Sequence, residues 1–159
     1  MKVFLVPNYY KDEAIQSGLT LELWLTRQGV EVAWAVDQRS GIKDETDISD
    51  FDLVISLGGD GTLLRAAHLV GTNEIPILGL SYGHIGFLTA ANPEEGDILR
   101  VVSDALADEM HVSRRATLCC EVHSVLPNGE ERVIVAQALN DLALTRGPLS
   151  DMVERSEER

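Results

Sequence analysis

The sequence predicts an α/β fold: a doubly wound, mostly parallel sheet followed by the start of a β-rich second domain. Two observations predict the sheet. Short apolar runs of strand length alternate with segments whose apolar residues recur at helical spacing, and turn residues separate the two kinds of segment. A third observation predicts the second domain, because helical spacing ends near Met110 and strand-like runs follow. We therefore expect an α/β domain at residues 1–109 and an incomplete β-rich segment at residues 110–159.

The chain begins with a strand, a helix and a second strand. The run "KVFLVP" at residues 2–7 is continuously apolar, which is typical of a parallel strand buried on both faces. A helix is expected over about residues 12–28, ending before Gly29, and a strand over residues 30–36. The polar, acidic stretch 37–50 predicts a long, mobile surface loop.

The same order of elements then repeats. A third strand is expected over residues 52–57, and "GGDGT" follows it directly. The next helix is expected to begin after Thr62 and to end near Gly71, where the chain can leave the helix. A fourth strand over residues 75–80 precedes the glycine-rich loop "SYGHIGF", and residues 92–110 carry strong helix signals.

The segment after Met110 contains two or three strand-like runs and a turn at Pro127–Gly129. Two or three strands with an uncovered face are marginally stable by themselves. We therefore expect this β-rich segment to be incomplete.

Composition excludes several classes of partner. The 159 residues include 13 Lys and Arg against 26 Asp and Glu, a formal net charge of −13. Without a basic stripe, this balance argues against nucleic acid and anionic membranes as partners. No apolar run approaches the roughly 20 residues that cross a bilayer, and no signal peptide is recognisable, so we expect a cytoplasmic protein. An anionic small substrate stays possible, provided that backbone N–H groups, a few arginines and a metal ion bind it.

The motif "GGDGT" joins a strand to a helix, the arrangement in which backbone N–H groups point outward at the carboxyl ends of strands. Gly58, Gly59 and Gly61 could adopt positive φ and let a phosphate approach the main chain. Thr62 could cap the helix or donate a hydrogen bond to a phosphate oxygen. The spacing matches neither the Walker A motif nor the GxGxxG dinucleotide fingerprint.

Asp60 is the unusual residue of this loop, because a carboxylate among phosphate-binding amides repels the ligand. One interpretation is that Asp60 caps a turn. The other is that it accepts or orients the proton of an attacking hydroxyl beside a phosphate that is being transferred. The motif alone leaves both open.

Four segments occur in an order and spacing that resemble the N-terminal half of NAD kinases: "LGGDGTLLRAA", "PILGLSYGHIGFLT", "RRATL" and "ALNDLALTRG", between Asp52 and Gly147. The resemblance implies transfer of a phosphoryl group from ATP, or polyphosphate, to the 2′-hydroxyl of the adenosine ribose of NAD, which gives NADP. Mg²⁺ or another divalent cation would arrive with ATP, held mainly by its phosphates, and no protein metal site is expected. The complete enzyme would be a homo-oligomer.

The resemblance also implies roles for particular residues. Asp60 would be the catalytic base. Gly58, Gly59 and Gly61 would line the phosphate and nucleotide pocket, and Arg65 would assist nucleotide binding.

Further positions of the resemblance lie later in the chain. Phe87 would lie against the adenine of the substrate, and Asn140 and Asp141 would hold adenine and a ribose hydroxyl. Without the resemblance, a core phenylalanine and an ordinary turn are the alternatives. The sequence departs from the family at Asp141, where glutamate is usual, and at Ser81, where asparagine is common.

Two other functions share features with this sequence. Diacylglycerol and sphingosine kinases also carry GGDGT, so a lipid kinase is one alternative, although it would need an apolar pocket or a membrane-facing patch. A non-catalytic domain that binds NAD(H) or ATP is the other. The later glycine-, serine- and threonine-rich segment that completes the family's nucleotide site is not in this sequence, so we expect a fragment or shortened relative of a longer kinase.

Overall fold

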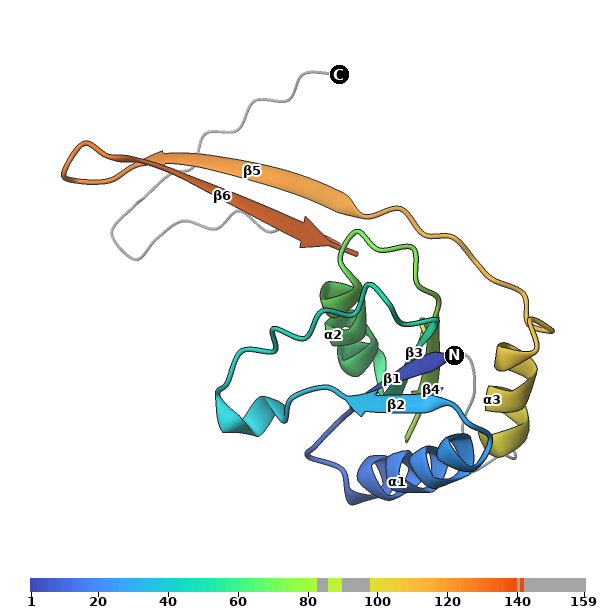
Figure 1. Ribbon diagram of the computed structural model, residues 1–159. Coiled ribbons are helices and arrows are strands. Elements are labelled where there is room, and N and C mark those ends of the chain that lie inside the picture. Colours follow the sequence, from blue (N-terminus) through green and yellow to red (C-terminus); the bar gives the residue numbers. More distant parts are fainter. Residues whose placement is uncertain (83–85, 90–97, 140, 142–159) are drawn as a thin grey trace. The chain divides into compact units, whose positions relative to one another are not determined.

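A computed structural model describes residues 1–82, 86–89, 98–139 and 141 (Figure 1). The chain divides into two compact units, Met1–Arg114 and Arg115–Arg159. Within the described residues, no helix combines the length and the apolar character needed to cross a membrane.

The first unit contains a four-stranded parallel sheet. Its strands are β1 (Lys2–Pro7), β2 (Glu31–Trp34), β3 (Leu53–Gly58) and β4 (Ile77–Ser81), in the order β2-β1-β3-β4. The two central strands are almost continuously apolar and buried, as expected for a parallel sheet covered on both faces. The predicted α/β fold with a parallel sheet is therefore confirmed.

Helices cover both faces of this sheet. α2 (Asp60–Val70) packs on one face, whereas α1 (Asp12–Arg27) and α3 (Ile98–Leu106) pack on the other (Figure 1). α1 begins with two acidic residues and ends with Arg27, which complements the helix dipole. The two-sided cover makes the sheet doubly wound.

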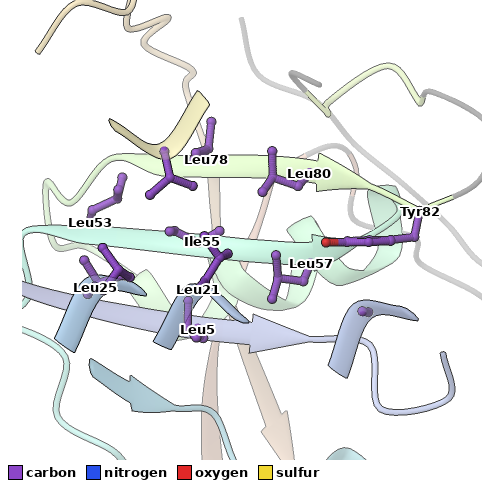
Figure 2. Packing of buried hydrophobic residues seen from close by; sticks show 12 residues of the cluster. Leu5, Leu21, Leu25, Leu53, Ile55, Leu57, Leu78, Leu80 and Tyr82 are labelled. Atoms are coloured by element: carbon purple, nitrogen blue, oxygen red, sulfur yellow. The ribbon is translucent and has the colours of Figure 1, made fainter. Parts of the chain in front are cut away.

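The larger part of the core lies between the sheet and α1. Alternate side chains of the strands point to this face, and Figure 2 shows Leu21 and Leu25 of α1 lying against them. The fully buried side chains here include Leu5, Leu21, Leu25, Ile55, Leu57, Leu80 and Val102. Val102 belongs to α3, so one face of the predicted helix at residues 92–110 is confirmed as core; residues 92–97 lie outside the described part.

The opposite face of the sheet forms a second apolar cluster beneath α2. Phe4, Val6 and Val54 of the strands pack there with Ala66 and Val70 of the helix. Because the intervening residues of the same strands face α1, every position of the central strands has an apolar environment. This arrangement explains why the strand sequences are continuous rather than alternating.

Several predicted boundaries and one loop differ from the observed ones: β4 begins at Ile77 rather than at residue 75, and α3 ends at Leu106 rather than at residue 110. β2 is shorter than the predicted 30–36, and α2 begins at Asp60 rather than after Thr62. The acidic stretch 37–50 is anchored to the first unit, because Ile48 is only 2% exposed and packs in the cluster beneath α2. Its polar composition gave no sign of this anchor.

The described part of the second unit is an antiparallel hairpin. β5 (Leu118–Val125) pairs with β6 (Glu131–Ala138), and Gly129 adopts a φ of 85° in the turn between them. The predicted turn at Pro127–Gly129 is confirmed. All side chains of both strands are exposed or half-buried, so among the described residues the faces of the hairpin have no core.

Candidate functional site

The strand order places a topological switch between β1 and β3. β1 is followed by α1 on one face of the sheet, whereas β3 is followed by α2 on the other. Ligands of open α/β sheets bind outside the carboxyl ends of the strands at such a switch. We use the term switch-point edge for the carboxyl ends of β1 and β3 together with the connections that leave them, residues 8–11 and 59–62. This edge is the candidate site.

The GGDGT motif leaves β3 at the switch-point edge and enters α2 at once. Gly59 is the N-cap residue, and its carbonyl accepts hydrogen bonds from the N–H groups of Thr62 and Leu63, at 2.9 and 3.1 Å. Asp60 and Gly61 therefore lie in the first turn of α2. N–H groups of a first helical turn have no acceptor within the helix, and the positive end of the helix dipole adds to their attraction for anions.

The three glycines of the motif have different surroundings. A Cβ added at Gly58 would overlap the buried side chain of Thr62, so Gly58 is needed for packing. Cβ atoms added at Gly59 and Gly61 would have no described atom within 4 Å, so these two positions leave the backbone open to a ligand. None of the three adopts positive φ, so the expectation of positive φ at these glycines is wrong.

Thr62 does not cap the helix. The N-cap position is taken by Gly59 without a side-chain hydrogen bond, and Thr62 lies inside the first turn with its side chain packed beside Gly58. The expectation of a Thr62 cap fails because α2 begins at Asp60, three residues earlier than its apolar spacing indicates.

The carboxylate of Asp60 reaches the second glycine-rich loop. Its Oδ2 accepts a hydrogen bond from the N–H of Phe87 at 3.0 Å, and its Oδ1 accepts one from the N–H of Leu88 at 3.2 Å. Asp60 is half-buried, so it is neither sealed in the core nor free in solvent. Two residues that the sequence analysis placed in one site, Asp60 and Phe87, are thereby brought together.

Phe87 itself projects into solvent. Its side chain is 98% exposed, so the interpretation of Phe87 as a core residue is wrong. The preceding residue, Gly86, donates its N–H to Thr89 Oγ1 at 3.1 Å, which closes a tight turn around Phe87. An aromatic ring presented in this way is available for stacking on a planar ligand.

Lys11 is a residue of the switch-point edge that the sequence analysis missed. Its Nζ donates a hydrogen bond to the carbonyl of Tyr82, which follows β4. Because β3 lies between β1 and β4, the side chain of Lys11 crosses the carboxyl end of β3. An ammonium group has three donors, and this bond uses one of them. The available signal was the basic residue in "PNYYK", directly after the first strand.

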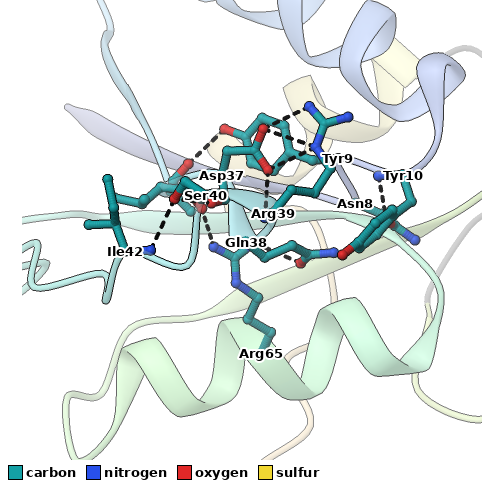
Figure 3. A network of polar contacts seen from close by, with 11 residues as sticks. Asn8, Tyr9, Tyr10, Asp37, Gln38, Arg39, Ser40, Ile42 and Arg65 are labelled. Atoms are coloured by element: carbon teal, nitrogen blue, oxygen red, sulfur yellow. Dashed lines mark hydrogen bonds and ion pairs between the residues drawn. The ribbon is translucent and has the colours of Figure 1, made fainter.

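Arg65 points toward the connection that follows β2 (Figure 3). Its guanidinium donates to the carbonyl of Val36 and to Gln38 Oε1, the latter at 3.2 Å. It also lies 3.9 Å from Asp44 Oδ2, which accepts the N–H of Val36 at 2.7 Å. The observed partners of Arg65 are thus residues of the loop, and its predicted assistance to nucleotide binding stays a prediction.

A polar network ties the connections after β1 and β2 to each other (Figure 3). The hydroxyl of Tyr9 donates to the carbonyl of Ala35 at 2.6 Å, and burial raises the pKa of Tyr9. The Arg39 guanidinium lies 5.8 Å from the centroid of the Tyr9 ring and pairs with Asp37 at 2.7 Å. The hydrogen bonds from Arg39 lower the pKa of Asp37.

The remaining predicted site residues belong to the second unit. Asp141 is exposed, and Asn140 lies outside the described residues. Among the residues that the structure describes, no group of three or more His, Cys, Asp or Glu side chains is placed to hold a metal ion.

The chain is similar in sequence to known kinases. A family model described as the ATP-NAD kinase N-terminal domain matches residues 37–110. An NAD kinase of Geobacter sulfurreducens is 34% identical over 149 residues, which is 89% of this chain and 50% of the relative. An NAD kinase of Caldanaerobacter subterraneus subsp. tengcongensis is 34% identical over 158 residues, 95% of this chain and 54% of the relative. The chain thus spans about half the length of these curated relatives.

A solved structure shares the fold. The crystal structure of yeast NADH kinase complexed with NADH superposes with a TM-score of 0.68 at 21% sequence identity. The match covers 88% of this chain and 47% of the yeast chain. The likeness therefore includes most of the described elements.

Proposed function

The chain belongs to the NAD kinase family, of which it carries the N-terminal domain, and from this premise we propose that it supplies the phosphoryl-transfer site of an NADP-forming enzyme. The reaction is transfer of a phosphoryl group from ATP, or polyphosphate, to the 2′-hydroxyl of the adenosine ribose of NAD. The observation that carries the proposal is the Asp60 carboxylate at the switch-point edge, bonded to the loop that presents Phe87.

Asp60 is the proposed catalytic base. The 2′-hydroxyl oxygen attacks the terminal phosphorus of ATP, the bond between that phosphorus and the bridging oxygen breaks, and ADP leaves. The hydroxyl proton passes to the Asp60 carboxylate. Each carboxylate oxygen accepts one backbone N–H in the structure and keeps a further lone pair for a substrate hydroxyl.

The phosphate chain of the donor is proposed to lie on the first turn of α2. Gly59 and Gly61 leave room for it beside the backbone, and the Lys11 ammonium adds positive charge at the same edge. Mg²⁺ or another divalent cation enters as the complex with ATP, as part of the substrate, and neutralises phosphate charge. These groups offset the repulsion from Asp60 and from the acidic chain.

Phe87 is proposed to stack on the adenine of NAD, with Asn140 and Asp141 bonded to adenine and a ribose hydroxyl. The exposed ring of Phe87 supports the first contact. The shorter side chain of Asp141, compared with glutamate, can still accept a hydrogen bond from a hydroxyl. Cytoplasmic location and homo-oligomeric assembly of the complete enzyme remain predictions.

A coupled assay for NADP tests the proposal. The chain is mixed with the C-terminal half of the Geobacter sulfurreducens NAD kinase, which supplies the part of the relatives that this chain does not match, and with NAD, ATP and Mg²⁺. We expect NADP formation, and we expect Asp60→Asn to lower it by about 10²–10⁴-fold, the usual contribution of a general base. The matched control is Asp52→Asn, which replaces another aspartate at the opposite end of β3.

Full activity of Asp60→Asn would remove Asp60 from the proposed role. Phosphorylation of a short-chain diglyceride in place of NAD would favour the lipid kinase. Nucleotide binding in a calorimeter with no NADP formed would favour the non-catalytic binding domain. The same chain assayed alone should form much less NADP than the mixture, because positioning supplies most of the catalysis in phosphoryl transfer.

A further inference from the structure

We propose that Asp60 is also a positioning residue, whose carboxylate holds the turn at residues 86–89 and so fixes where Phe87 is presented. The turn is twenty-seven residues away in sequence. The contact between Asp60 and this turn lies entirely within the first unit. Its consequence for NAD binding rests on the proposed function.

Side-chain oxygens accept three successive backbone N–H groups of this turn. Thr89 Oγ1 accepts the N–H of Gly86, Asp60 Oδ2 accepts that of Phe87, and Asp60 Oδ1 accepts that of Leu88. A run of successive N–H groups that point to one side forms a concave site for an anion. Here the anion is the carboxylate of Asp60, and hydrogen bonds to an ionised acceptor are stronger than neutral ones.

Gly86 is the residue that lets the carboxylate come so close. A Cβ added at this position would overlap both the carboxyl carbon and the oxygens of Asp60. The close approach of the Asp60 carboxylate therefore requires a glycine at this position.

In the proposed complex, the Asp60 carboxylate contacts the ribose hydroxyl directly and acts on adenine only through the turn that presents Phe87. The lone pairs that do not accept the turn's N–H groups remain for the ribose hydroxyl, while the turn presents the ring that stacks on adenine. Losing the carboxylate should impair adenine binding as well as proton transfer. Losing only the contact, with the carboxylate retained, should impair adenine binding more than proton transfer.

Amide hydrogen exchange tests whether Asp60 fixes the turn. It is measured for each residue of this chain by NMR, without any nucleotide. We expect the Phe87 and Leu88 amides to be protected in the wild type. Asp60→Asn keeps the shape of the side chain but replaces one acceptor by a donor, and should raise exchange at these amides by about tenfold or more. Gly86→Ala should raise it similarly with the carboxylate unchanged.

The matched control is Asp52→Asn. Asp52 also accepts a backbone N–H, from Lys2 at 2.7 Å, but at the other end of the sheet. The Asp52→Asn variant should leave the exchange rates of the Phe87 and Leu88 amides unchanged. Protection of the β3 amides of Val54 and Ile55 reports in every variant that the sheet is folded.

The proposal is overturned if the two amides exchange equally in the wild type and in Asp60→Asn while β3 stays protected. It is also overturned if Gly86→Ala leaves both amides protected, and this variant carries the test if Asp60→Asn does not fold. In the NADP assay, Gly86→Ala should raise the KM for NAD at least tenfold and lower kcat less than Asp60→Asn does. If no NADP forms while the amides exchange as expected, the proposed function is refuted, but the contact between Asp60 and the turn at residues 86–89 is confirmed.

Discussion

The glycines of the GGDGT motif differ in the physical reason for being glycine. Gly58 makes room for the side chain of Thr62, whereas Gly61 lies in the first turn of α2 with open space where a Cβ would be. One glycine of the motif is thus required for packing inside the protein, and another leaves the backbone accessible to a ligand. Substitutions at these positions should separate the two.

We predict that Gly58→Ala lowers the free energy of unfolding by about 1–3 kcal/mol, because the added methyl group overlaps Thr62. Gly61→Ala should keep or raise stability by up to about 1 kcal/mol, because alanine favours a helix over glycine. The same Gly61→Ala variant should bind ATP more weakly, because its methyl group occupies the space proposed for phosphate. Urea unfolding and calorimetric titration with ATP check the two effects.

A Gly61→Ala protein that binds ATP as well as the wild type would show that the phosphates lie elsewhere. A Gly58→Ala protein of unchanged stability would show that Thr62 can move aside at no cost.

Asp60 shows what a motif can and cannot indicate about a residue. Its position after a strand indicated either a turn cap or a group that acts on a hydroxyl. The observed contact fits neither in full, since the carboxylate binds N–H groups of a different loop. No local pattern predicts a bond between residues twenty-seven positions apart.

At the scale of elements, the connection after β2 departs most from its prediction. Its acidic composition indicates a solvated loop, yet Ile48 is buried and the Asp44 side chain is largely buried beside Arg65 of α2. The loop is held by one apolar anchor and one charged anchor. The charged anchor is Arg65 of α2, and Ile48 lies in the apolar cluster that includes Ala66 and Val70 of the same helix, so the loop is held on the side of the sheet that α2 covers.

We predict that Arg65→Met lowers the free energy of unfolding by about 1–3 kcal/mol, because it removes donors to Val36 and Gln38 and a positive charge beside Asp44. Denaturant unfolding measures the change. Arg27→Met is the control, because Arg27 is exposed at the end of α1 and should change stability by less than about 0.5 kcal/mol.

If Arg65→Met is as stable as Arg27→Met but binds ATP more weakly, then the role of Arg65 is in nucleotide binding, as the family resemblance implies. If both properties change, the loop and the nucleotide share this residue.

At the scale of the whole molecule, the two units differ in how they are stabilised. The first unit, Met1–Arg114, buries apolar side chains on both faces of its sheet. The hairpin of the second unit presents Leu118, Val122 and Ile134 from one face of its two strands, and all three are exposed. A two-stranded hairpin without a core contributes little stability.

We predict that residues 1–114, expressed alone, unfold in one cooperative transition with a midpoint close to that of the full chain. The core that determines the transition lies wholly within these residues. Circular dichroism during heating provides the measurement. A midpoint lower by more than about 5 °C, the shift that roughly 1 kcal/mol produces, would show that the second unit stabilises the first.

The sequence by itself determined the alternation of strands and helices, the parallel sheet, the position of the GGDGT loop at its carboxyl edge and the family. The elements follow from local patterns, because apolar spacing, capping residues and glycine turns act over a few neighbouring residues, whereas the family follows from the order and spacing of four motifs. Only the tertiary structure decided that Asp60 binds the turn of Phe87, that Lys11 crosses the end of β3, and that Arg65 and Ile48 anchor an acidic loop. Each of these contacts joins segments distant in sequence, and the strand order, which no local pattern encodes, brings them together.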